Sequence, residues 1–167
     1  MTGKIELKWG ALIGLANLAW LYLSYYLGFG DNGLAMIRMT VLVGFILSVA
    51  GYVFGLREVH RSVPESTFIE SVRSGAIIGG IATVIAVLAQ FGYLKWIDPG
   101  YTEYVAGETG KHFEKSGLSE EEVAQVVEGA RKTYGFTNCL LQAGLGAFIT
   151  GILSTFVIVA VRTRLRR

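Results

Sequence analysis

The amino-acid sequence predicts an all-α membrane protein with four transmembrane helices and an extracytoplasmic helical insert between the third and fourth. Apolar residues make up 52% of the chain and charged residues only 17%, against roughly 25% in ordinary soluble domains. The charges are gathered in short blocks, which leaves four long uncharged stretches. A soluble protein of 167 residues has too small an interior to bury four such stretches. We therefore expect residues 1–167 to form a single transmembrane domain.

The first helix is expected over residues 9–30, which carry no charge. About 20 residues suffice to cross the hydrocarbon core of a bilayer. A basic start before an apolar run is also typical of a signal peptide, but this run is too long and too aromatic, and no Ala-x-Ala site follows it. Residues 28–33, GFGDNG, match the Gly-x-Gly-x-x-Gly pattern, but they lie between two helices and not after a strand, so they predict a turn.

The second helix is expected over residues 34–56, with Arg38 near its start. A charge at the bilayer centre costs about 2.5 to 3.5 kcal/mol on insertion scales. Residues 39–56 supply 18 uncharged positions, which are enough to span the bilayer alone. We therefore expect Arg38 at the membrane interface, with its charged end in water.

The third helix is expected over residues 67–97 and has both of its ends marked. Thr67 and Glu70 fit the Ser/Thr-x-x-Glu capping box, in which each side chain pairs with a free backbone N–H at the helix start. The 21 residues from 74 to 94 carry no charge. Pro99 disfavours helical geometry at the residue before it, so the helix should end just ahead of that position.

Residues 98–132 form the one sizeable polar segment and are expected to be helical in part. Ser119 and Glu122 make a second capping box, followed by apolar residues at helical spacing, which predicts an amphipathic helix over residues 119–134. The fourth transmembrane helix is expected over residues 133–161. These 29 uncharged residues exceed the thickness of the hydrocarbon core, so this helix should tilt or project.

The distribution of charge predicts the orientation. If both termini are cytoplasmic, the cytoplasmic segments carry nine basic residues against four acidic ones, and the outer segments carry six against nine. The positive-inside rule favours this arrangement.

Three segments resemble a bacterial four-helix membrane family catalogued as a domain of unknown function, number four-one-nine-nine. They are STFIESVRSGAIIGG at 66–80, GYLKWIDPGY at 92–101 and EKSGLSEEEV at 114–123. The positions that match the family pattern include Phe68, Gly75, Asp98 and Pro99. The resemblance implies this topology and a bacterial inner (cytoplasmic) membrane, and it brings no activity, cofactor or catalytic residue.

Small residues recur at alternating spacings of four and three along the second, third and fourth helices, which places them on one face of each. In lipid, close approach at such residues holds helices together, so they predict the packing surfaces of the bundle or of a homo-oligomer. The glycines among them are Gly44, Gly51, Gly75, Gly79, Gly144 and Gly151.

Several polar residues are expected at one level near the outer surface of the membrane. In the predicted topology Arg38, Gln90, Asn138 and Gln142 lie in the outer third of the bilayer, and Asp31 lies just beyond. Such groups must pair inside the bundle. They either form hydrogen bonds between helices or line a polar vestibule for a ligand or ion.

The sequence contains no catalytic motif, no cofactor motif and no set of metal ligands, so no enzymatic activity is predicted. A net charge of +2 without a single basic patch argues against nucleic acid as a partner. We expect a structural or accessory subunit that binds a membrane partner. The alternative is a small oligomeric transport or permeation protein that uses the outward-facing vestibule.

Overall fold

The computed structural model describes residues 3–30 and 32–165. Within these residues the chain is all-α, as predicted, with six α-helices and one π-helical segment. In chain order they are α1 (Gly3–Tyr26), α2 (Gly33–Ser62), α3 (Phe68–Gly92), η1 (Tyr93–Ile97), α4 (Tyr101–Glu114), α5 (Glu120–Thr133) and α6 (Phe136–Leu165).

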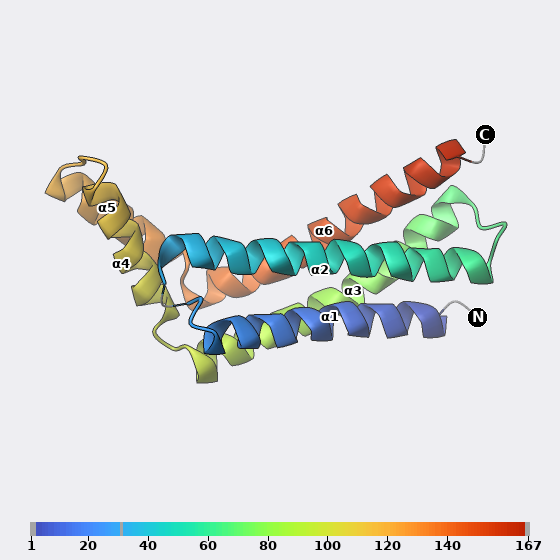
Figure 1. The fold of residues 1–167 in the computed structure, drawn as a ribbon, viewed down its shortest axis with the longest axis horizontal. Coiled ribbons are helices and arrows are strands. Elements are labelled where there is room, and N and C mark those ends of the chain that lie inside the picture. The colour runs from blue at the N-terminus through green and yellow to red at the C-terminus, as the bar shows by residue number, and fades with distance from the viewer. Residues whose placement is uncertain (1–2, 31, 166–167) are drawn as a thin grey trace.

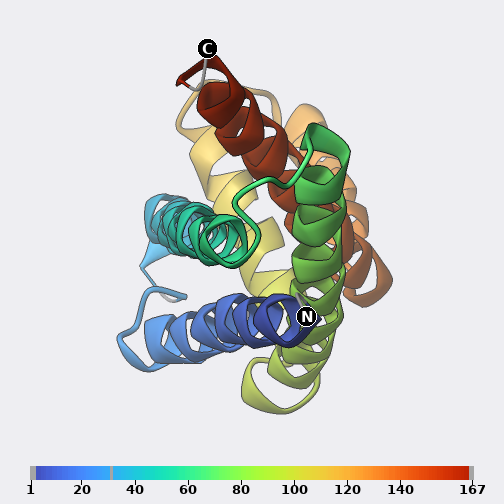
Figure 2. The ribbon, with the colours of Figure 1, turned by 90° about the vertical axis from the view of Figure 1, so that its right-hand side faces the viewer.

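Four long helices, α1, α2, α3 and α6, form an elongated bundle, and α4 and α5 form a hairpin at one end of it (Figure 1). The described ends of the chain lie at the opposite end, close to the turn between α2 and α3. α3 packs against both α1 and α6. α2 lies on the opposite side of the bundle from α3 and packs against α1 and α6 (Figure 2). Accordingly, 39% of the most apolar stretch of α3 is buried, against 17% in α2 and in α6.

Two helices begin at the predicted capping boxes. The Thr67 hydroxyl accepts a hydrogen bond from the backbone N–H of Glu70, whose carboxylate accepts the N–H of Thr67 at 2.8 Å. Ser119 and Glu122 form the same reciprocal pair at the start of α5. Both predicted helix starts are confirmed, because each box supplies partners for backbone groups that a helix start leaves unpaired.

The ends of the other helices differ from the predicted ranges. α1 begins at Gly3 instead of residue 9, α2 continues to Ser62 instead of residue 56, and α6 runs to Leu165 instead of residue 161. The predicted ranges followed the uncharged stretches, but charged residues continue a helix where they reach water or, like Glu6, have a polar partner. α1 ends at Tyr26 instead of residue 30, because the chain turns at Gly28, whose φ of 76° favours glycine.

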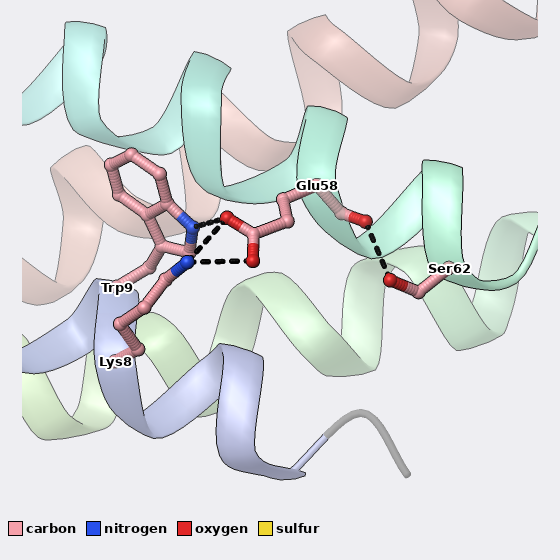
Figure 3. A network of polar contacts seen from close by, with 4 residues as sticks. All are labelled: Lys8, Trp9, Glu58 and Ser62. Carbon is pink, nitrogen blue, oxygen red and sulfur yellow. Dashed lines mark hydrogen bonds and ion pairs between the residues drawn. The ribbon is translucent and has the colours of Figure 1, made fainter.

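Two polar contacts hold α1 against its neighbours at the end of the bundle that carries the termini. The Lys8 ammonium and the Trp9 indole N–H both donate to the Glu58 carboxylate of α2, at 2.6 and 2.7 Å (Figure 3). Glu6, which is 4% exposed, accepts a 2.5 Å hydrogen bond from the Ser74 hydroxyl of α3. The first turns of α1 are therefore part of the bundle.

Each glycine predicted to mediate helix packing faces another helix. Gly79 of α3 and Gly151 of α6 meet directly: a Cβ added at Gly151 would lie 3.3 Å from the Gly79 Cα. The contacts of the others are Gly44 with Asn17, Gly51 with Ile13, Gly75 with Thr155 and Gly144 with Val87. The backbones approach closely where side chains are absent.

Within the described residues, three helices are long and apolar enough to cross a membrane: Gly33–Ser62, Phe68–Ile97 and Phe136–Arg164. Their length and composition indicate a multi-pass membrane protein. α1 is not among these helices, because its mean hydropathy is lower. It contains Asn17, two tryptophans, several tyrosines and charged residues near its start. Helix composition thus supports three of the four predicted spans.

Candidate functional site

A partly open cavity of about 820 Å³ lies between α1, α2, α3 and α6. Its volume is within the range of about 300–1,000 Å³ typical of ligand pockets. Most of its wall is apolar, and Tyr101 of α4 and Tyr134 close to the start of α6 line its end near the hairpin. Arg38 and Tyr52, both on α2, are fourteen residues apart and both line it, so the cavity extends over about 21 Å of helix at 1.5 Å per residue.

Small side chains create this space. α3 contributes Ala82, Ala86 and Ala89 to the wall, and α6 contributes Ala143, Gly146 and Ala147. Where the glycines of α3 and α6 meet, the two helices are in contact, but nearer the hairpin these short side chains do not fill the volume between α3, α6 and α2.

Tyr52 forms the inner end of the cavity. Its side chain is 1% exposed, and its hydroxyl lies over the contact between Gly79 and Gly151, 3.1 Å from where a Gly79 Cβ would stand. Among the described residues this hydroxyl has no hydrogen-bond partner. An unpaired buried hydroxyl costs about 1–3 kcal/mol, and most buried polar groups in proteins are paired. The hydroxyl is packed into this glycine contact and is not exposed to the cavity, so Tyr52 closes the inner end with the rest of its side chain.

Three of the residues predicted to form a polar cluster come together around the opposite end. Arg38, Gln90 and Gln142 line the cavity from α2, α3 and α6. The Gln142 amide donates to the Thr133 carbonyl at 2.8 Å, which fixes its direction. Asn138 is exposed and instead donates to the Lys132 carbonyl at 2.6 Å, so it is not part of the cavity wall. Asp31 lies outside the described residues.

A family model described as "Protein of unknown function (DUF4199)" matches residues 8–164. The chain belongs to the DUF4199 family. The match includes every residue of the cavity wall and confirms the predicted family. No curated protein and no solved structure matches the chain. What this DUF4199 protein does must therefore be argued from the cavity itself.

Further polar groups of the DUF4199 cavity were not among the predicted cluster. Asn17 donates to the Ser48 hydroxyl at 3.0 Å across α1 and α2, and the Trp20 indole donates to the Thr40 carbonyl at 2.8 Å. Tyr52 has a recognisable signal, since it is the one tyrosine of α2 and lies beside Gly51 within the small-residue face. Burial also raises the pKa of the Tyr101 phenol above its ordinary value.

Proposed function

We propose that this protein binds an amphipathic molecule in the cavity between its membrane helices. The observation that carries the proposal is the apolar cavity itself, which is closed at its inner end by Tyr52 and holds Arg38 at its other end. Apolar walls with a few convergent polar groups are the usual composition of a ligand site.

The lining predicts the chemistry of the ligand. The Arg38 guanidinium can hold a carboxylate or phosphate with two parallel hydrogen bonds, and the amides of Gln90 and Gln142 lie at the same end. An apolar chain then follows the wall toward Tyr52. We infer binding and not catalysis, because the described cavity lining contains no carboxylate and no histidine that could act as a general base.

We infer further that α1 is the fourth transmembrane helix. It packs along α3 and beside α2 while exposing Leu12, Leu15 and Leu23 on its outer face. If its two neighbours cross the bilayer, α1 lies at the same depth. With both termini in the cytoplasm of a bacterial inner membrane, the Arg38 end of the cavity faces outward.

A closed inner end supports holding a ligand over conducting one. Tyr52 lies above the glycine contact of α3 and α6, so the cavity does not continue along the bundle as a pore within one chain. Transport through an oligomer, the predicted alternative, would need a path made with a second copy.

A role as an accessory subunit is the second candidate, and the α4–α5 hairpin favours it. The hairpin projects from the bundle (Figure 1) and is tied to it by few contacts, such as the Gly33 N–H donating to the Tyr104 hydroxyl at 2.8 Å. Its exposed surface is charged, so a partner would be recognised by charge. Replacing Glu120 and Glu121 with lysine, while keeping the Glu122 cap, should abolish such an association and leave ligand binding intact.

The experiment fills the cavity without disturbing the fold. A Cβ added at Gly146, which lines the cavity, meets nothing within 4 Å, so Gly146→Leu should be tolerated and should occupy the ligand volume. Gly80→Leu is the matched control, because Gly80 is also an open helix glycine but does not line the cavity. Native mass spectrometry of protein extracted in mild detergent then measures the bound amphiphile.

We expect wild type and Gly80→Leu to carry a bound amphiphile and Gly146→Leu to lose it while remaining folded. Equal retention by both leucine variants would overturn the cavity as the binding site. Absence of any bound amphiphile from wild type, with none taken up from added oleate, would overturn the proposed function.

A further inference from the structure

A second, separate pocket of about 360 Å³ lies between α2 and α6 at the end of the bundle that carries the termini. Its rim is basic: Arg57, His60 and Arg61 come from α2, and Arg162 comes from α6. Its remaining lining residues are Val53 and Ile158, one turn nearer the middle of each helix. The pocket therefore has a cationic outer part and an apolar inner part.

The arginine of α6 is held in place before any ligand arrives. Its two terminal nitrogens donate to the Ser66 hydroxyl at 3.3 Å and to the Pro64 carbonyl at 3.1 Å. Arg162 is thus fixed by the turn between α2 and α3, which sets the guanidinium beside the pocket.

The two arginines of α2 supply the remaining charge. Arg57 and Arg61 are one helical turn apart on one face, where like charges repel each other. Neither forms an ion pair with a described residue. Glu58, the carboxylate nearest in sequence, is hydrogen-bonded to Lys8 and Trp9 of α1 and acts on Arg61 only through its charge, without an ion pair. An anion between the arginines would offset this repulsion.

We propose that this pocket binds the phosphate ester of an anionic phospholipid. A phosphate matches guanidinium groups geometrically and in charge, and basic pockets between membrane helices are suited to lipid head groups. The apolar residues below the rim favour a lipid over a free phosphate ester. Val53 in the pocket is 41% exposed, and the neighbouring positions Phe54 and Val157 are exposed as well, so an apolar surface leads away from the pocket. An acyl chain can follow this surface into the bilayer.

The test titrates phosphatidylglycerol into the purified full-length protein in a neutral detergent and counts bound lipid by native mass spectrometry. Removing two interfacial arginines should weaken binding by about thirtyfold, at about 1 kcal/mol for each charge. We expect this loss in Arg57→Gln/Arg61→Gln. The control Arg73→Gln/Arg164→Gln removes the same charge from exposed positions outside the pocket and should bind as wild type does.

Equal weakening in both double variants would overturn the pocket, since the basic residues would then act only through overall charge. Glycerol 3-phosphate, added at the same concentration, separates the two sources of phosphate ester: competition as strong as that of the lipid overturns the lipid assignment. Arg57→Lys/Arg61→Lys keeps charge and helix but not the paired donors, so binding equal to wild type would overturn recognition by the guanidinium groups. None of these arms involves the cavity near Arg38.

Discussion

Gly79 and Gly151 allow α3 and α6 to cross with their backbones in contact. A methyl group at Gly151 would collide with the Tyr52 hydroxyl and would stand 3.3 Å from the Gly79 Cα. The phenol of Tyr52 thus occupies space that exists only because both glycines lack side chains. One residue from each of three helices fixes the inner end of the cavity.

Gly151→Ala should therefore destabilise the protein, by about 1–3 kcal/mol for overpacking. Thermal unfolding in detergent measures this change. The companion Gly80→Ala places the same methyl group where nothing lies within 4 Å, and it should be neutral or stabilising because alanine favours the helix. Adding Tyr52→Phe to Gly151→Ala should recover part of the loss, and no recovery would contradict the role given to the hydroxyl.

The buried Glu6 carboxylate depends on its contact with Ser74. Ser74→Ala removes the donor and leaves a buried acceptor without that partner, so we expect a loss of about 1–3 kcal/mol in the free energy of unfolding. Ser62→Ala is the control, because Ser62 is exposed and bonds only to the Glu58 carbonyl of its own helix (Figure 3). Similar losses of unfolding free energy in both variants would contradict the stabilising contribution assigned to the hydrogen bond between Ser74 and Glu6.

The start of α5 is held by a titratable cap. Hydrogen bonds from the Ser119 hydroxyl and backbone N–H lower the pKa of Glu122, so the folded cap favours the ionised carboxylate. Its stabilising contribution is complete above the pKa of the unfolded chain, about 4.3 for a glutamate, and is lost as the pH falls through the lower pKa of the folded state.

Hydrogen exchange at the first turn of α5, corrected for the intrinsic rate, should therefore show protection that is constant near neutral pH and decreases in acid. Glu122→Gln keeps a capping partner without the titration, so it should flatten this pH dependence. An unchanged pH dependence in Glu122→Gln would contradict the assignment of the cap.

The sequence was sufficient to predict the four long helices, α5 and both capping boxes, because these depend on residues close together in the chain. α4 lay in a segment that was predicted only to be helical in part. The helix ends were less predictable, since the uncharged stretches mark the membrane and not the helix. Depth along a span can be counted from the rise per residue, so Arg38, Gln90 and Gln142 were placed at one level. Asn138 was not separable from Gln142, because its bond to Lys132 depends on the turn before α6. The cavity could not be predicted, because its size depends on the distances between helices. The spacing of residues along one helix does not determine those distances.

Across the whole molecule, the end that carries the termini has seven basic residues against four acidic ones among the described residues, and the hairpin stands at the other end. With that basic end in the cytoplasm, a protease site inserted at Gly117, in the exposed turn between α4 and α5, should be cut from outside intact spheroplasts. A protease site after Arg164 should be cut only after the membrane is permeabilised. The reverse pattern would contradict both the orientation and an outward-facing cavity.

An amphiphile held in the cavity between the spans would lie beside Trp20, which is part of the cavity wall. Quenching of tryptophan fluorescence by a dibrominated stearate in nanodiscs measures occupancy directly, with the Trp20→Phe variant giving the background of Trp9 and Trp96. We expect a saturable quenching component that disappears in Trp20→Phe and in Gly146→Leu and persists in Gly80→Leu. Quenching of equal size in all four proteins would contradict it, because the stearate would then reach only the outer surface of the bundle.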